Sequence, residues 1–168
     1  MYLRDGELVI GDWLESDAPA VHAACQDREI QRWIPVPRPY TIDHAREFVR
    51  TATGFAIREN GVLVGSIALR VTTHNTANVG YWCTPPARGR GIMTRALRRV
   101  CRYALDDLAI DRIEMTAYRD NIASHRVAEK AGFQREGVMR SKFAHPDGHR
   151  IDAVMFSLLP GELIEPSQ

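Results

Sequence analysis

The sequence lacks the features that mark several large classes of protein. Its three cysteines, Cys25, Cys83 and Cys101, have no paired spacing and no neighbouring cysteine–histidine cluster. We therefore expect reduced thiols, with no disulfide framework and no metal site. The first residues lack the apolar segment of a signal peptide, and no stretch approaches the about 20 apolar residues that span a bilayer. These absences predict a cytoplasmic protein without a membrane partner.

An excess of charge of either sign is also missing. The 168 residues include 22 Lys and Arg and 21 Asp and Glu, a formal net charge of +1, which does not favour nucleic acid as a partner. One predicted helix carries four arginines without interleaved aromatic residues, which indicates a solvated face rather than an RNA site: Arg95, Arg98, Arg99 and Arg102. With 45% hydrophobic residues, the chain can bury the core of one globular domain, expected to cover residues 1–168.

Alternating apolar residues and turn signals predict a mixed α/β chain. Strands are expected over residues 8–14, 55–58, 62–71, 79–83, 112–118, 133–143 and 150–159. Helices are expected to start near Asp17, Thr41, Gly91 and Asn121. Asn60-Gly61 is typical of a two-residue hairpin turn, and Gly132 of a helix end. The tail from Pro160 is expected to be loose.

A glycine turn between a strand and a long amphipathic helix is the most informative stretch. The first N–H groups of a helix have no partner within it, and the helix dipole adds positive charge there. Gly89 and Gly91 would let an anion approach these amides, and Arg88 and Arg90 bring guanidinium groups that suit phosphate oxygens. The pattern predicts a pyrophosphate cradle, although it also fits a flexible basic turn. A P-loop and a Rossmann fingerprint are excluded, because Gly-Lys-Ser/Thr and the third glycine are missing.

Three motifs extend this signal. They are Gly80-Tyr-Trp, then Pro86-x-Arg-Gly-x-Gly-Ile-Met-Thr, then Asn121-x-x-Ser-x-x-Val-x-Glu-Lys-x-Gly-Phe, followed by Glu136-Gly137. Together they resemble the GNAT superfamily of acyl-CoA-dependent N-acetyltransferases, and within it the Rim-type branch that acetylates protein N-terminal α-amines. The resemblance covers residues 8–158. Met93 stands where the superfamily prefers a small residue, but Rim-type members often carry a larger one there.

The resemblance implies a fold and a cosubstrate. The fold is an α+β domain with a mixed, mostly antiparallel central sheet of about seven strands and helices on both faces. The strands of Tyr81 and Met115 would splay apart around acetyl-CoA, and homodimers are common in the branch. Cys83 and Thr84 would pair by their backbones with the pantetheine arm. The implied cofactor-binding residues are Cys83, Thr84, Arg88, Gly89, Arg90, Gly91, Ile92, Met93, Asn121 and Ser124.

A proline-rich segment marks the expected acceptor side. Its three prolines between residues 35 and 39 exclude a regular helix or a central strand. In the family, the corresponding helix–loop–helix lines the acceptor cleft, so Trp33, Ile34 and Tyr40 are candidate acceptor-binding residues. The alternative is that Trp33 and Tyr40 only hold the loop to the core.

Catalytic groups are sparse. Many members of the superfamily use a tyrosine as the general acid, and this chain has Ala128 at that position. Rim-type enzymes use a serine instead, which matches Ser124. Ser124 is therefore the candidate acid to the CoA sulfur, although it could instead satisfy a helix amide. Asn78 replaces a carboxylate that many relatives carry. Cys83 has no assignable histidine partner, which disfavours a nucleophilic role. No base is assigned, and the remaining candidates are Glu136, Glu114, His22 and His44.

The missing base bears on the acceptor. An α-amine with a pKa near ~8 is roughly one-tenth neutral at pH 7, whereas a lysine with a pKa of ~10.4 is neutral about once in 2,500 molecules. The sequence therefore predicts an enzyme that moves an acetyl group from acetyl-CoA to a protein or peptide N-terminal α-amine, by direct attack in a ternary complex. One alternative is a small-molecule acceptor, such as an amino sugar, antibiotic or polyamine. Another is a non-catalytic acyl-CoA-binding module.

Overall fold

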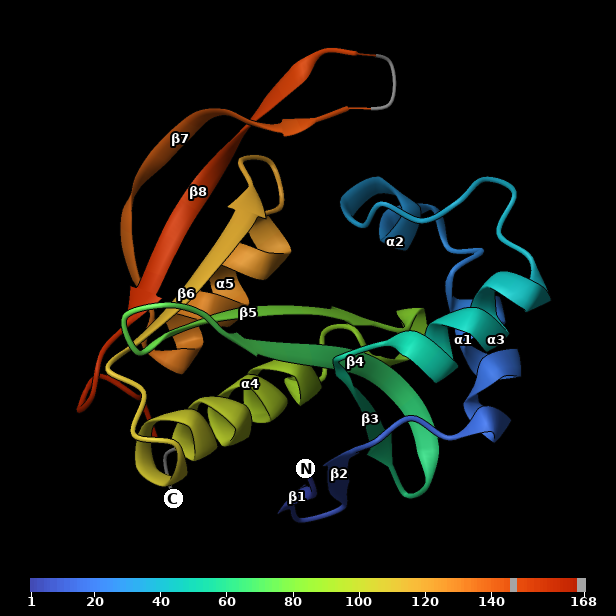
Figure 1. Ribbon diagram of the computed structural model, residues 1–168, viewed down its shortest axis with the longest axis horizontal. Helices are drawn as coiled ribbons and strands as arrows, with labels where there is room; N and C mark the ends of the chain where they lie inside the picture. Colours follow the sequence, from blue (N-terminus) through green and yellow to red (C-terminus); the bar gives the residue numbers. More distant parts are fainter. Residues whose placement is uncertain (146–147, 166–168) are drawn as a thin grey trace. The chain divides into compact units, whose positions relative to one another are not determined.

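The computed structural model describes residues 1–145 and 148–165. Contacts divide the chain into two compact units, which are described separately. The first unit comprises Met1–Ala68 and Tyr81–Ala96, and the second comprises Leu69–Gly80 and the chain from Leu97 onward. Figure 1 shows the elements, coloured along the sequence. Pro146 and Asp147, in the turn of the expected closing hairpin, lie outside the described residues.

The described strands form one mixed sheet in the order β1-β2-β3-β4-β5-β6-β8-β7. They are β1 (Leu3–Asp5), β2 (Leu8–Gly11), β3 (Phe55–Glu59), β4 (Val62–Val71), β5 (Thr76–Cys83), β6 (Arg112–Tyr118), β7 (Gln134–Ala144) and β8 (Arg150–Leu158). Strand β5 pairs with β6 in parallel, whereas the pairs β1–β2, β2–β3, β3–β4, β6–β8 and β7–β8 are antiparallel. The predicted fold class is confirmed, and the short strand β1 adds one strand to the expected seven.

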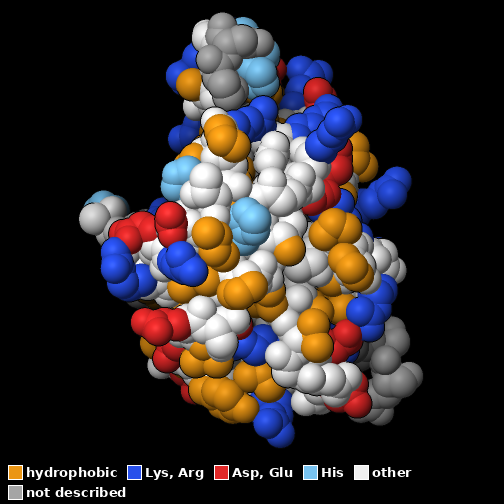
Figure 2. Space-filling view, turned by 90° about the vertical axis from the view of Figure 1, so that its right-hand side faces the viewer, with side chains coloured by type: hydrophobic (Ala, Val, Ile, Leu, Met, Phe, Trp, Pro, Cys, Tyr) orange, Lys and Arg blue, Asp and Glu red, His pale blue; other side chains and the backbone are white. Residues whose placement is uncertain are grey.

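The helices are α1 (Ala18–Ala24), α2 (Arg28–Trp33), α3 (Ile42–Thr51), α4 (Ile92–Arg102) and α5 (Ile122–Ala131). Short 3₁₀ turns cover Glu15–Asp17 and Pro85–Ala87, and a π-helical turn covers Tyr103–Asp107. Among the described residues, no helix has both the length and the apolar character needed to cross a bilayer. On the face drawn in Figure 2, acidic and basic side chains are interspersed, as the balanced composition predicts.

In the first unit, α1 and α3 share a core with strands β3 and β4. Val21, Ala45 and Ala56 are fully buried in this core. As predicted, Thr41 caps α3: its hydroxyl accepts the His44 N–H at 3.3 Å, and His44 Nδ1 accepts the Thr41 N–H at 3.1 Å. Asp17 does not cap α1, because its carboxylate accepts the Leu14 N–H and pairs with Arg58. The helix starts after Asp17 as predicted, but the Asp17 side chain makes no cap hydrogen bond, since an arginine distant in sequence binds it.

Two glycines of the first unit determine where the strands run. Asn60 and Gly61 have φ angles of 50° and 80°, which confirms the predicted hairpin turn between β3 and β4. A Cβ atom on Gly65 would lie 2.5 Å from the Trp82 carbonyl oxygen, so only glycine allows β4 to approach β5 this closely. This approach positions the end of β5, from which the glycine turn begins.

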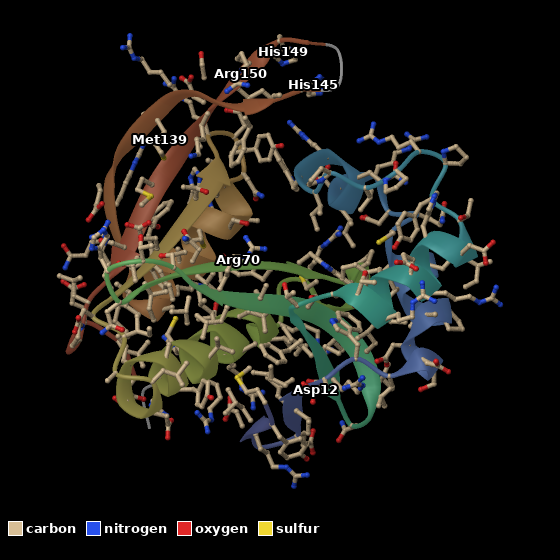
Figure 3. All side chains as sticks on the ribbon, viewed as in Figure 1. Asp12, Arg70, Met139, His145, His149 and Arg150 are labelled. Atoms are coloured by element: carbon tan, nitrogen blue, oxygen red, sulfur yellow. The ribbon has the colours of Figure 1, made fainter. Side chains whose placement is uncertain are left out.

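The second unit packs α5 beside β6, as Figure 1 shows. Strand β6 matches its predicted bounds, and its alternate residues Ile113 and Met115 are buried. Strands β7 and β8 form the closing hairpin, whose pairing shifts register between Met139 and Phe143. Figure 3 labels Arg150 near the far end of this hairpin, where its guanidinium donates to the Ser141 carbonyl oxygen at 2.9 and 2.6 Å.

The predicted helix over residues 91–108 passes into the π-helical turn after Arg102. Its arginines do not form a merely solvated face. Arg95 donates to the Asp5 carboxylate at 2.9 Å, Arg98 donates to the Lys130 carbonyl oxygen at 2.6 Å, and Arg102 pairs with Glu165. The Arg95 and Arg102 side chains stay 41% and 39% exposed, so this face is in contact with solvent and also makes hydrogen bonds to distant parts of the chain.

The end of the chain also differs from the expected loose tail. The Ile164 N–H donates to the Ala131 carbonyl oxygen at 3.1 Å, and Glu162 accepts the Leu159 N–H at 2.8 Å. Gly132 has a φ of 108°, and a Cβ atom there would lie 2.2 Å from the Glu162 carbonyl oxygen. Residues 160–165 thus pack over the end of α5, held by backbone hydrogen bonds that the side-chain pattern does not predict.

Candidate functional site

The glycine turn leads from β5 into α4. Gly89 and Gly91 both have a φ of 74°, and a Cβ atom at either would meet nothing within 4 Å. Gly91 precedes the first residue of α4 and has no side chain with which to cap the helix. No acceptor in the described part of the chain contacts the N–H groups of Gly89, Gly91 or Ile92. The turn therefore presents main-chain donors at a helix N-terminus, an arrangement that suits a diphosphate.

The first side chains of α4, which follow this turn, are buried. Ile92 and Met93, both predicted cofactor-binding residues, are buried, as is Thr94 after them. Because their side chains are buried, their contribution to a ligand would come from the backbone. The larger residue at Met93 is thus accommodated by burial.

The two arginines of the turn are already paired. Arg88 donates to both carboxylate oxygens of Asp27, at 3.2 and 2.9 Å, and Arg90 donates to Glu59 at 2.7 Å. The Arg88 guanidinium lowers the pKa of the Asp27 carboxyl. The prediction that both guanidinium groups face a phosphate did not anticipate these ion pairs, because Asp27 and Glu59 are distant in sequence. The main-chain amides are the donors that the turn leaves for a ligand.

The end of β5 differs from the expectation in one respect. The Thr84 N–H donates to the Val64 carbonyl oxygen at 2.9 Å, and the Thr84 carbonyl oxygen accepts the Ala87 N–H at 3.0 Å. The backbone of Thr84 thus holds the turn, and the pairing of Cys83 and Thr84 with the pantetheine arm stays a prediction. Cys83 is half-buried, and burial raises the pKa of its thiol, which disfavours the thiolate that a nucleophile would need.

Of the three candidate acceptor residues, Tyr40 is buried, whereas Trp33 and Ile34 are both half-buried. Tyr40 is only 6% exposed, and burial raises the Tyr40 pKa well above its usual range. Ile34 packs against the same hydrophobic cluster. Trp33, at the end of α2, donates from Nε1 to Glu29 at 3.1 Å. Tyr40 thus packs into the core of the first unit, and the acceptor roles of Trp33, Ile34 and Tyr40 stay predictions.

In the second unit, Asn121 and Ser124 lie at the start of α5. Asn121 is the N-cap, and its Oδ1 accepts the Ser124 N–H at 3.1 Å. Ser124 is half-buried at the third helical position, while Ala128, where many relatives have tyrosine, is fully buried. The Ser124 amide is thus satisfied by Asn121 and does not require the serine hydroxyl. The roles of Asn121 and Ser124 toward acetyl-CoA stay predictions.

Three of the four candidate bases are held by other groups. Arg112 donates to Glu114 at 2.8 Å and to both carboxylate oxygens of Glu136 at 2.8 and 2.7 Å. The Ser157 hydroxyl also donates to Glu136, and together with Arg112 it lowers the Glu136 pKa to about 2. His44 Nδ1 accepts the cap hydrogen bond from Thr41. A carboxylate held so firmly in its ionised form is a poor proton acceptor at neutral pH.

Two further residues bear on the choice of base. His22 is half-buried and stacks on Tyr40 at a centroid distance of 6.4 Å. Asn78 is half-buried on β5 opposite Glu114 of β6, and its amide cannot take a proton. Sequence reasoning missed the Arg112 network because Arg112 and Glu136 lie on strands separated in the sheet by β8. Only the strand order brings them together.

Comparison with known proteins supports the class predicted from the sequence, the GNAT N-acetyltransferases. Residues 7–134 match the family model described as the acetyltransferase (GNAT) domain. The chain is 25% identical over 170 residues to the uncharacterized N-acetyltransferase YoaA of Bacillus subtilis (strain 168), covering 94% of this chain and 96% of YoaA. It is 31% identical over 88 residues to the ribosomal-protein-serine acetyltransferase of Escherichia coli (strain K12), covering 51% and 49% of the two chains.

Two solved structures are close in fold. A GNAT-family acetyltransferase from Bacillus anthracis superposes with a TM-score of 0.88 at 25% identity, covering 95% of this chain and 98% of that chain. The ribosomal L7/L12 α-N-protein acetyltransferase RimL, solved in complex with coenzyme A, superposes with a TM-score of 0.83 at 21% identity, with coverage of 95% and 98%. The chain belongs to the GNAT family of N-acetyltransferases, whose acyl donor is acetyl-CoA.

Proposed function

We propose that this N-acetyltransferase moves the acetyl group of acetyl-CoA to the α-amine of a protein or peptide N-terminus. The amine attacks the thioester directly, within a ternary complex. The observation that carries the proposal is that three of the four candidate bases are held by other groups: Arg112 holds Glu114 and Glu136, and a helix cap holds His44. An enzyme with few groups able to accept a proton works best on an amine that is already partly neutral.

The energetic argument favours an α-amine over a lysine. At pH 7 the neutral fraction of an α-amine exceeds that of a lysine side chain by roughly 250-fold, which corresponds to about 3 kcal/mol. A lysine acetylase must recover this difference through base catalysis or desolvation. An N-terminal acceptor avoids most of it. The E. coli relative, which carries the name ribosomal-protein-serine acetyltransferase, supports a protein acceptor.

The residues of the chain have separate tasks in this mechanism. The main-chain amides of the turn from Gly89 to Ile92 hold the pyrophosphate of acetyl-CoA. The Ser124 hydroxyl donates to the CoA sulfur as the thioester carbon–sulfur bond breaks. A thiol leaving group with a pKa near ~8.5 needs only modest help of this kind at neutral pH. Proximity of the amine to the thioester then supplies much of the rate enhancement.

The test measures release of CoA thiol from acetyl-CoA by the purified protein. The acceptors are short peptides with Ser, Ala, Met or Gly at a free N-terminus, and matched peptides whose N-terminus is blocked but which contain lysine. Polyamines and aminoglycosides complete the panel. We expect turnover only of the free N-termini. Turnover of the blocked peptides, or of the small amines alone, would contradict the proposal.

The pH dependence provides a second, independent test. With a neutral amine as nucleophile, kcat/KM should rise about tenfold per pH unit below the amine pKa and level off near pH ~8. A profile that is flat through the amine pKa would show that deprotonation of the acceptor does not limit the reaction, and would argue against direct attack by an unassisted amine.

A further inference from the structure

The ion pair between Arg88 and Asp27 joins two parts of the first unit that have different tasks. Arg88 lies in the glycine turn, directly before Gly89. Asp27 lies 61 residues earlier, at the N-cap of α2, the helix that carries Trp33. Two guanidinium nitrogens meet two carboxylate oxygens, at 3.2 and 2.9 Å, so the pair restricts orientation as well as distance. The turn and α2 are therefore joined by a directional contact.

The segment around α2 is tied together as one piece. Gln26 Nε2 donates to the Tyr40 carbonyl oxygen at 2.9 Å, and Gln31 Nε2 donates to the Cys25 carbonyl oxygen at 2.8 Å. These bonds link the end of α1, helix α2 and the proline-rich loop after it. A change in the position of Asp27 is therefore expected to move the segment that carries the candidate acceptor residues Trp33 and Ile34.

The second arginine of the turn provides a natural comparison. Arg90 makes one hydrogen bond to Glu59, which ends β3 at the β3–β4 hairpin. The Asp27 side chain is 14% exposed and that of Arg88 is 37% exposed, against 18% for Glu59 and 51% for Arg90. Both pairs thus join the same turn to a shielded carboxylate. Only the Arg88 pair is bidentate, and only that pair reaches α2.

We infer that Arg88 and Asp27 are positioning residues that hold the acceptor-side helix α2 against the cofactor turn. In this arrangement the Arg88 guanidinium serves the acceptor, while the main-chain amides of the same turn meet the phosphates. The inference rests on the proposed function in one respect, because it takes the segment after α2 as the acceptor side. Its structural content, the dependence of α2 on the turn, does not require a known acceptor.

The test compares three single variants: Asp27→Asn, Arg88→Gln and the matched control Glu59→Gln. Both carboxylate variants are isosteric, and each removes the partner of one arginine of the turn. We expect Asp27→Asn and Arg88→Gln each to raise the KM for a peptide acceptor about fivefold, as for a partly exposed ion pair, with little change in CoA affinity. The double variant Asp27→Asn/Arg88→Gln should be no worse than either single one, because both remove the same contact. Glu59→Gln should leave the acceptor KM unchanged.

A phosphate role for Arg88 would give a different result. Arg88→Gln would then weaken CoA binding, whereas Asp27→Asn would not weaken it; that outcome would overturn the inference. If Arg88→Gln does not fold, the charge-swapped pair Asp27→Arg/Arg88→Asp replaces it. Recovery of the acceptor KM in the swapped protein relative to Asp27→Asn supports the inference, and lack of recovery counts against it.

Amide hydrogen exchange separates failure of this inference from failure of the proposed function. Protection of residues 28–34 should fall about fivefold in Asp27→Asn and in Arg88→Gln, and stay unchanged in Glu59→Gln. This measurement needs no acceptor. Unchanged protection in all three variants would overturn the inference even if the peptide assay succeeds, and selective loss of protection would sustain the link to α2 even if no peptide is acetylated.

Discussion

The starts of α4 and α5 are built in opposite ways. At α5, Asn121 supplies an acceptor for the Ser124 N–H, and Gly132 closes the helix in the left-handed conformation. At α4, Gly91 precedes the first helical residue and has no side chain to act as a cap. Loss of a cap typically costs about 1 kcal/mol. A fold that caps one helix and omits the cap at the other leaves donors where a ligand can supply the acceptor.

The largest effect should come from giving α4 a cap of its own. Gly91→Asp places a carboxylate at the helix start, where it competes with phosphate for the amides and repels it, and it strains a residue with a φ of 74°. We expect CoA affinity to fall about 100-fold, or roughly 2.8 kcal/mol, measured by calorimetric titration.

The matched control for this change is Gly61→Asp. Gly61 has a φ of 80° and equally open surroundings, but it lies in the β3–β4 turn. Its substitution should cost comparable stability without altering CoA affinity. Equal loss of CoA binding in both variants would mean that backbone strain alone explains the effect. The uncapped start of α4 would then have no specific role in binding CoA.

A smaller effect is expected at the third position of each helix. Thr94 in α4 is buried, whereas Ser124 in α5 is half-buried and is the candidate acid. Ser124→Ala should lower kcat about tenfold while CoA affinity stays the same, since general acid help to a thiol is modest at neutral pH. Steady-state kinetics measure the change. Ser124→Thr, which keeps a hydroxyl, should retain more activity; an unchanged kcat in Ser124→Ala would exclude the acid role.

Removal of the cap at α5 tests whether Asn121 does more than cap. Asn121→Ala should lower stability by about 1 kcal/mol, or roughly 2–4 °C in Tm. Thr41→Ala removes the equivalent cap of α3 and should cost about the same. The predicted hydrogen bond from Asn121 to the pantetheine should appear as a loss of CoA affinity in Asn121→Ala alone. Unchanged affinity in both variants would leave Asn121 with only a structural role.

The smallest effect concerns the paired charges of the second unit. Arg112 and Ser157 lower the Glu136 pKa from its ordinary value of 4.5 to about 2, so the folded state favours the ionised carboxylate. This contribution is present above pH 4.5 and is lost as the pH falls toward 2. Since the Glu136 side chain is 42% exposed, it amounts to less than about 1 kcal/mol.

The variant Glu136→Gln tests this contribution and the exclusion of Glu136 as base. Its Tm should lie slightly below that of the parent at pH 7, and the two should converge near pH 2. Activity at pH 7 should be retained, because a carboxylate held by Arg112 does not accept the proton of the amine. A loss of kcat with an altered pH profile would instead identify Glu136 as the base.

Local signals allowed much of the fold to be predicted. The bounds of β6, the Asn60-Gly61 turn, the Thr41 cap and the end of α5 at Gly132 all agree with the structure, because each depends on residues within a few positions. The glycine turn before α4 was predicted from the sequence for the same reason, since its signal lies within a few adjacent residues. The expected single domain over residues 1–168 stays a prediction, as do the roles assigned to the site residues.

The contacts that sequence reasoning missed all join distant segments. Arg88 meets Asp27 across 61 positions, and Arg112 reaches Glu136 only because β8 lies between β6 and β7. An arginine beside glycines has the same local pattern whether it meets a phosphate or a carboxylate. Its partner is decided by the packing of other elements, which local periodicity does not describe.

The packing of Glu162 over Gly132 also bears on the order in which the chain is made. The segment that covers the end of α5 follows β8, so the ribosome synthesises it after the helix that it covers. During synthesis, α5 therefore emerges with its last turn uncovered, and the hydrogen bond from Ile164 to Ala131 forms only once residues 160–165 have left the exit tunnel. The second unit consequently completes its packing after translation of its strands has ended, whereas nearly all of the first unit has already emerged by then.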